Sequence, residues 1–131
     1  MIMIDTHTWL WWFSNPEKLS QRALQAIMAA KEHDKIYVSA VSAWEIALLK
    51  KKGRVTLAME VEEWIARADQ VPFLEIIPLD AHLAIRSVDL ADFPVNDPAD
   101  RFIVATAIDK NMTLVTRDGR IREYGAVTTL W

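Results

Sequence analysis

Short apolar runs that alternate with helical segments constrain the fold of this chain more than any other feature. Runs rich in aliphatic and β-branched residues, which are typical of strands, cover residues 2–5, 36–39, 74–78, 113–116 and, more weakly, 127–130. Strands separated by helices form parallel βαβ units with right-handed crossovers. We therefore expect an α/β fold, a three-layer α/β/α sandwich around a mainly parallel sheet of about five strands.

The segments between these runs show helical periodicity. Within residues 60–70, Val61, Trp64, Ile65 and Ala68 form one apolar stripe, and residues 20–33 and 43–52 also read as helices, the latter ending at Gly53. Residues 102–108 are apolar on all sides, so a buried helix and a strand are both conceivable. A helix is favoured because Asp97 and Pro98 form a typical helix start and Asn111 lies at a suitable end.

Length and composition limit the class of protein. The 131 residues, 52% of them hydrophobic and 25% charged, predict one self-folding domain over residues 1–131. The N-terminal apolar run is too short for a signal peptide and no stretch could span a bilayer, so we expect a soluble protein. The absence of cysteine excludes disulfides and thiolate ligands and fits a cytoplasmic location.

The overall charge argues against general nucleic-acid coating. A formal net charge of −3 is the wrong sign for a protein that binds phosphates over its whole surface. RNA remains a conceivable substrate if a basic rim surrounds an acidic centre that holds a cation, because the cation reverses the local charge.

Acidic residues follow the predicted strands or begin the predicted helices. Asp5 closes the first strand and could simply cap the next helix. Glu45 lies three residues after Ser42, the spacing of a capping box, which would explain it structurally. Each of these two acids therefore has a local interpretation beside a catalytic one.

The second half of the chain repeats this ambiguity. Asp97 suits an N-cap, whereas Asp100 so close to it would be repelled unless a cation or Arg101 offset the charge. Asp118 and Gly119 could form a hairpin turn, although the residues that follow look more like a short helical turn.

The four acids become informative when they are considered together. Ligands of open parallel sheets bind beyond the carboxyl ends of the strands, which is where this pattern would bring Asp5, Glu45, Asp100 and Asp118. Clustered carboxylates repel one another unless a divalent cation with a preference for oxygen ligands is bound. The sequence thus favours a site for Mg²⁺ or Mn²⁺.

These residues resemble the PIN-domain ribonucleases, in particular the VapC-type toxins of prokaryotic toxin–antitoxin pairs. The resemblance extends over essentially the whole chain and depends on four motifs in order. They are Ile-Asp-Thr-His-Thr (4–8), Ser-Ala-Val-Ser-Ala-Trp-Glu-Ile (39–46), Asp-Pro-Ala-Asp-Arg-Phe-Ile-Val-Ala (97–105) and Leu-Val-Thr-Arg-Asp (114–118).

The resemblance implies roles for individual residues. Asp5, Glu45, Asp100 and Asp118 would form the catalytic acidic quartet, with Asp5, Asp100 and Asp118 as metal ligands, and Thr6, Asp97 and Thr116 would support them. Ala99 departs from the pattern, because many relatives carry an aromatic residue there. The implied reaction is metal-assisted hydrolysis of RNA, and the implied partners are a cognate antitoxin and a second copy of the chain.

Basic and aromatic residues add candidates for binding. Arg101 and Arg117 each adjoin a proposed ligand, and Lys50 and Lys51 follow the Glu45 helix, so these four are our candidates for contacts with RNA, although ordinary solvated surface explains many such residues. The tryptophans and phenylalanine within residues 9–13 cannot share one helix face, which suggests a dimer or antitoxin interface. The histidines are too scattered for a metal site.

Two other classes of function remain open on the sequence. A phosphotransfer protein could use Asp5 as the acceptor, but the Asp-x-Asp pattern of aspartate-nucleophile phosphatases fails because residue 7 is His7. A non-catalytic PIN-like module could bind RNA or protein, and the presence of all four acids counts against it.

Overall fold

A central parallel sheet organises the protein. The computed structural model describes residues 1–131 and contains five strands in the order β3-β2-β1-β4-β5, with every neighbouring pair parallel. The strands are β1 (Ile2–Ile4), β2 (Ile36–Ser39), β3 (Leu74–Ile77), β4 (Thr113–Val115) and β5 (Thr129–Leu130). The predicted α/β sandwich with a parallel sheet is confirmed.

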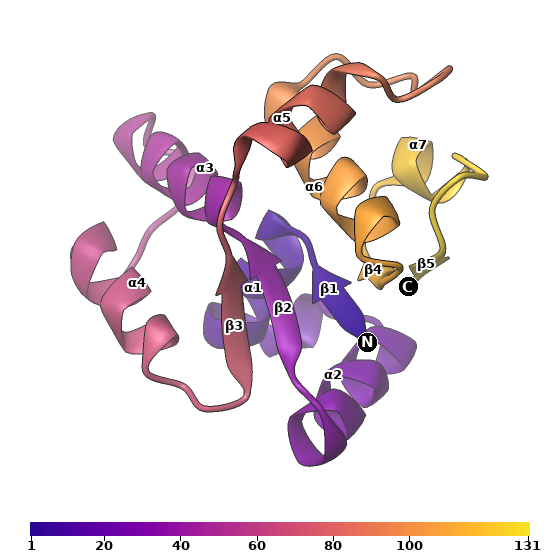
Figure 1. The fold of residues 1–131 in the computed structure, drawn as a ribbon. Helices are drawn as coiled ribbons and strands as arrows, with labels where there is room; N and C mark the ends of the chain where they lie inside the picture. The colour runs from indigo at the N-terminus through magenta and orange to yellow at the C-terminus, as the bar shows by residue number, and fades with distance from the viewer.

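Helices connect the strands and cover the sheet (Figure 1). They are α1 (Thr6–Ser14), α2 (Gln21–His33), α3 (Ala40–Lys51), α4 (Val61–Asp69), α5 (Ala81–Val88), α6 (Pro98–Asp109) and α7 (Gly119–Arg122), with a short 3-10 helix at Pro16–Lys18. None of them is long and apolar enough to cross a membrane. The sequence analysis missed α5, whose start is marked by Asp80 as N-cap.

Two apolar cores lie on opposite faces of the sheet. Met3 belongs to the core beneath α5, α6 and α7, whereas its neighbour Ile4 belongs to the core beneath α1, α2 and α4. Leu114 and Val115 of β4 divide in the same way. This alternation is the period of a β-strand, in which successive side chains point to opposite faces, and it explains why central strands buried on both sides are wholly apolar.

The prediction of a buried helix over residues 102–108 is confirmed, because these residues belong to α6 (Pro98–Asp109). Asp97 caps it through hydrogen bonds from the amides of Ala99 and Asp100, and Pro98 occupies its first turn. Asn111 follows its end with a φ of 53°, a left-handed conformation that asparagine tolerates. Gly53 plays the same part after α3 with a φ of 70°.

One predicted helix start is wrong. Ser39, at the end of β2, caps α3 by accepting a hydrogen bond from the amide of Val41, so the helix begins at Ala40 and not after Ser42. Ser42 lies inside the helix and is fully buried, where its hydroxyl oxygen accepts a 2.9 Å hydrogen bond from Thr6. Glu45 is therefore not part of a capping box, and capping no longer explains it.

The hairpin alternative for Asp118 is excluded by the topology. Asp118 caps the short helix α7 by accepting hydrogen bonds from the amides of Arg120 and Ile121. The chain then returns to β5, which pairs with β4 in parallel. The carboxyl ends of all five strands consequently lie along one edge of the sheet.

Candidate active site

The change of direction in strand order defines where the site lies. From β1 the chain adds β2 and β3 on one side of the sheet, and it then crosses to place β4 on the other side of β1. Such a switch point leaves a crevice beyond the strand ends, because the connections leave in opposite directions. Asp5 follows β1 and Asp118 follows β4, so both acids lie at this crevice.

The crevice is a pocket of about 860 Å³ that gathers the predicted acids. Its lining includes Asp5, Glu45, Asp97, Asp100 and Asp118, which come from sequence positions as far apart as 5 and 118. The structure thus brings all four predicted catalytic acids, and the predicted supporting acid Asp97, into one cavity.

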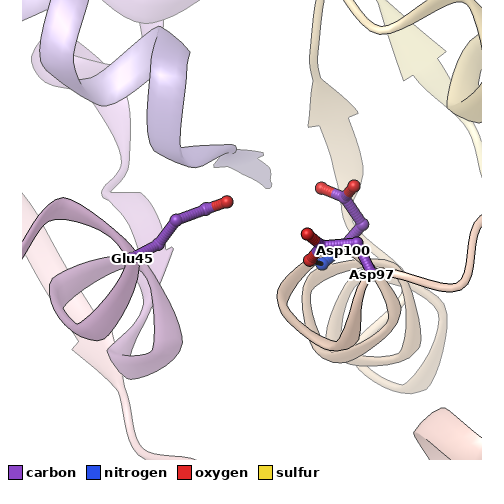
Figure 2. Close-up of side chains that lie close together, drawn as sticks. All are labelled: Glu45, Asp97 and Asp100. Carbon is purple, nitrogen blue, oxygen red and sulfur yellow. Dashed lines mark hydrogen bonds between the residues drawn. The ribbon is translucent and has the colours of Figure 1, made fainter. Parts of the chain in front are cut away.

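The tightest group of carboxylates differs from the predicted ligand trio. Glu45, Asp97 and Asp100 each offer a carboxylate oxygen, and these oxygens lie within 4.8 Å of one another. Figure 2 shows Glu45 extending from α3 toward Asp97 and Asp100 at the start of α6. Asp97, expected only as support, therefore lies as close to Glu45 and Asp100 as a metal-binding group requires.

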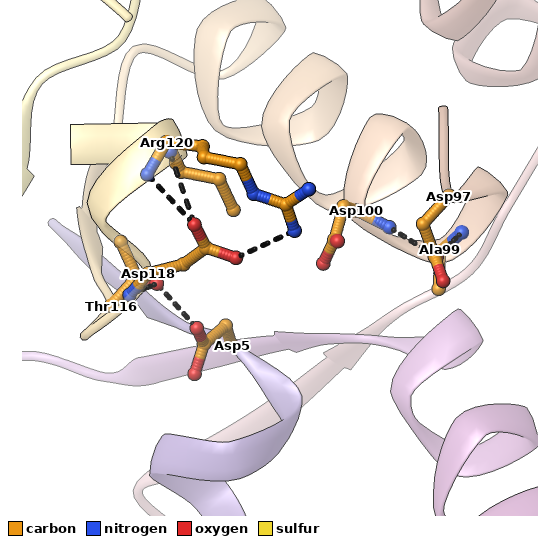
Figure 3. A network of polar contacts seen from close by, with 8 residues as sticks. Asp5, Asp97, Ala99, Asp100, Thr116, Asp118 and Arg120 are labelled. Atoms are coloured by element: carbon orange, nitrogen blue, oxygen red, sulfur yellow. Dashed lines mark hydrogen bonds and ion pairs between the residues drawn. The ribbon is translucent and has the colours of Figure 1, made fainter. Parts of the chain in front are cut away.

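Asp5 and Asp118 are held by hydrogen bonds at the other side of the pocket (Figure 3). One oxygen of Asp5 accepts from the amide of Thr8 and the other from the hydroxyl of Thr116. Thr116 is fully buried and its hydroxyl oxygen also accepts from the amide of Asp118, so it ties the two acids together. This is the contact expected of a supporting residue.

Thr6 supports the site indirectly. It is buried at the start of α1, and its hydroxyl donates to Ser42 inside α3. The hydrogen bond fixes α1, which begins beside Asp5, against the helix that carries Glu45. Ala99, where the sequence departs from the PIN pattern, points away from the pocket and is buried in the core beneath α6.

The electrostatics of the cluster are unfavourable without a counterion. Burial, followed by the negative charges of Asp97, Glu45, Asp118 and Asp5, raises the pKa of Asp100 from 3.8 to about 7. Burial is also the main reason that the pKa of Glu45 is raised. Arg120 offsets part of the charge through a 3.6 Å ion pair with Asp118, and its guanidinium extends between Asp118 and Asp100 (Figure 3).

The donor set fits a divalent cation. Carboxylate oxygens are the ligands that Mg²⁺ and Mn²⁺ prefer, and the pocket offers no cysteine. A bound cation would counter both the burial and the repulsion that raise the pKa of Asp100 to about 7.

The basic residues are distributed differently from the prediction. Arg117 lines the pocket, with its guanidinium carbon 5.8 Å from the centre of the Trp11 ring. Lys50 and Lys51 line a separate groove between α3 and α4, where Lys50 pairs with Glu60 at 3.3 Å. Lys52 and Arg54, just beyond them, line the acidic pocket instead.

Arg101 is also not brought to the pocket. Its guanidinium donates hydrogen bonds to the carbonyls of Ser87, Val88 and Val95, and it lies 5.6 Å from the centre of the Phe93 ring. These contacts fix the end of α5 and the loop before α6, which gives Arg101 a structural part. The pocket is also lined by His7, Lys18 and Trp44, to which the sequence analysis gave no role in the site.

Comparison with known proteins agrees with this geometry. The model of the family described as "PIN domain" matches residues 2–127. The chain belongs to the PIN-domain family. A relative, "Ribonuclease VapC22" of Mycobacterium tuberculosis, is 39% identical over 124 residues, which cover 94% of this chain and 91% of the relative.

Several solved structures share the fold. The chain superposes on a structure titled VapBC2 from Rickettsia felis bound to a promoter DNA fragment with a TM-score of 0.70 and 18% identity, covering 99% of this chain and 98% of the other. FitAcB from Neisseria gonorrhoeae gives a TM-score of 0.70 and 20% identity, covering 100% and 97%. The predicted resemblance to VapC-type PIN proteins is confirmed.

The raised pKa of Asp100 predicts how pH affects the metal-free protein. Its ordinary value of 3.8 applies to the unfolded chain, so between about pH 4 and pH 7 the folded state retains a proton that the unfolded state has lost. The contribution of Asp100 to the free energy of unfolding therefore decreases as pH rises through this range. We expect Asp100→Asn to melt a few degrees higher than the wild type at pH 8 in chelator, with the difference vanishing toward pH 4.

Thermal unfolding followed by circular dichroism at several pH values tests this expectation. The control is Asp92→Asn, which makes the same substitution at an exposed aspartate in the loop before α6, outside the pocket. A variant Asp100→Asn that is destabilised equally at every pH would contradict the electrostatic account of the cluster.

Proposed function

We propose that this PIN-domain protein is a divalent-metal-dependent endoribonuclease and the toxin of a type II toxin–antitoxin pair, acting in the cytoplasm as one domain over residues 1–131. The observation that carries the proposal is the convergence of Asp5, Glu45, Asp97, Asp100 and Asp118 in one pocket at the switch point of the sheet. The relative of 39% identity, whose printed name is a ribonuclease, supports the choice of reaction.

Asp5, Asp100 and Asp118 are the proposed metal ligands, directly or through water, with Mg²⁺ or Mn²⁺ as the cation. Asp97 joins them because its carboxylate lies in the tightest group with Asp100. Thr116 and the amide of Thr8 fix both oxygens of Asp5, and the α7 amides fix Asp118, so these ligands are held in place before the cation arrives. When bound, the cation supplies Lewis-acid activation of the phosphodiester and a lower pKa for water.

Glu45 is the residue best suited to handle a proton. Its side chain points into the pocket without a capping duty, and burial raises its pKa, which makes the carboxylate a stronger base. We assign it the positioning and deprotonation of the attacking water. Attack occurs in line with the departing 3′ oxygen, and no covalent link to the protein forms.

The basic rim positions the substrate. Lys52, Arg54, Arg117 and Arg120 line the same pocket as the acids and provide the positive charge that phosphates require. This arrangement reconciles RNA as substrate with the net charge of −3, because positive groups are concentrated around the pocket.

Removal of one metal ligand is expected to abolish cleavage and leave the fold intact. Asp118→Asn keeps the size of the side chain and its ability to cap α7, but it loses the negative charge, so RNA cleavage should fall at least a hundredfold. The measurement is cleavage of cellular RNA with sequencing of the cut ends, beside Asp92→Asn as a control and circular dichroism as a test of folding.

Chelation gives the second arm of this test. Excess chelator should stop cleavage by the wild type, and Mg²⁺ or Mn²⁺ should restore it. Cleavage at the wild-type rate without divalent cations would exclude the proposed mechanism. If neither the wild type nor Asp118→Asn binds the cations in calorimetry, and neither cuts RNA, the non-catalytic binding module is the better interpretation.

An antitoxin is the proposed protein partner. One solved structure that shares this fold is titled a toxin–antitoxin complex from Klebsiella pneumoniae, and others carry VapBC or FitAB in their titles. We expect the wild-type chain to arrest bacterial growth when it is expressed alone, Asp118→Asn to leave growth unaffected, and the product of an adjoining gene to restore growth by binding the chain. Growth at the normal rate with abundant wild-type protein would count against a toxin.

A homodimer is the second proposed assembly. The side chains of Ile85 and Val88 on α5 are 63% and 75% exposed, and because they are three residues apart they lie on one face of the helix and form a small apolar patch. We expect Val88→Asp to reduce the molecular mass in multi-angle light scattering from that of two chains to that of one. A single-chain mass for the wild type at high protein concentration would exclude the dimer.

A further inference from the structure

Trp44 differs from the other tryptophans of the protein. Each of the other five packs against an aromatic ring: Trp9 against Trp64, Trp11 against Trp131, and Trp12 against Phe73. Trp44 has no such partner, and its surface is 54% exposed. Core packing therefore does not account for this large side chain.

Trp44 lines the pocket that holds the proposed catalytic acids. It precedes Glu45 in α3. Leu48 and Lys52 follow it at intervals of four residues and line the pocket too, so the three residues form one row along the helix, about 12 Å long. The row starts with an aromatic face and ends with a positive charge.

An aromatic ring followed along the helix by a positive charge is better suited to binding a single nucleotide strand than to binding a protein surface. Proteins bind single strands by stacking bases on aromatic rings while basic side chains hold the phosphates. Lys52 and Arg54 supply the positive charge at the far end of the row, and the carboxylates beside Trp44 mark the place of the scissile phosphodiester. A base within a duplex is stacked on both faces and could not cover the ring.

We propose that Trp44 is a stacking platform for an unpaired nucleobase beside the cleaved phosphodiester. The inference rests on the proposed function and adds a substrate-positioning residue to it. The indole covers one face of the base, and the base fixes the register of the backbone over Glu45 and Asp100.

The proposal is tested by comparing the binding of two single-stranded oligonucleotides, one with bases and one without. A short fluorescein-labelled RNA of mixed sequence is compared with an abasic strand of equal length and charge, by fluorescence anisotropy with Ca²⁺ in place of Mg²⁺. We expect Trp44→Ala to bind the ordinary strand about tenfold more weakly than the wild type, and Trp44→Phe to recover part of the loss. Both variants should bind the abasic strand as the wild type does.

The control is Met28→Ala, which removes an exposed apolar side chain of α2 away from the pocket. It should change the affinity neither for the ordinary RNA strand nor for the abasic strand. If Trp44→Ala binds ordinary RNA as tightly as the wild type, or weakens binding of both strands equally, stacking is excluded, and a protein surface becomes the better partner for Trp44. If the wild type neither binds nor cuts RNA, the proposed function itself fails and this inference with it.

Discussion

Parallel pairing of β1 with β4 is the constraint on which the site depends. The register that sets Ile4 beside Val115 brings the ends of both strands to the same edge of the sheet. There the hydroxyl of Thr116 donates a hydrogen bond to Asp5 and accepts one from the amide of Asp118. An antiparallel β4 would carry Asp118 to the opposite edge. Because the chain places β2 and β3 on one side of β1 and β4 on the other, a crevice forms beyond the strand ends, and α3 and α6 add Glu45 and Asp100 to it.

Helix starts make this concentration of negative charge tolerable. Asp5, Asp97 and Asp118 are the N-caps of α1, α6 and α7, so each carboxylate accepts hydrogen bonds from amides at the positive end of a helix. Asp100 has no such cap duty and carries the strongly raised pKa. The local interpretation of these acids as caps and the functional one are therefore compatible, since one oxygen can cap while the other faces the pocket.

Particular residues show how far the sequence could be interpreted. The strands, the buried helix after Pro98 and the α7 turn follow from hydrophobic period and cap chemistry, which are local properties. The capping box at Ser42 was wrong because Ser39 competes for the same helix start, and spacing alone cannot rank two serines. Helix α5 was missed although Asp80 caps it, because the segment is short.

By itself, the sequence determined the parallel α/β class and placed Asp5, Asp100 and Asp118 at strand ends or helix starts, since both depend on neighbouring residues and on period. Only the tertiary structure decided which side chains share the pocket. Successive residues of a helix point about 100° apart, so Lys52 faces the acids while Lys50 and Lys51 line another groove. Likewise, packing against Phe93 and three carbonyls draws Arg101 away from Asp100, its neighbour in the chain.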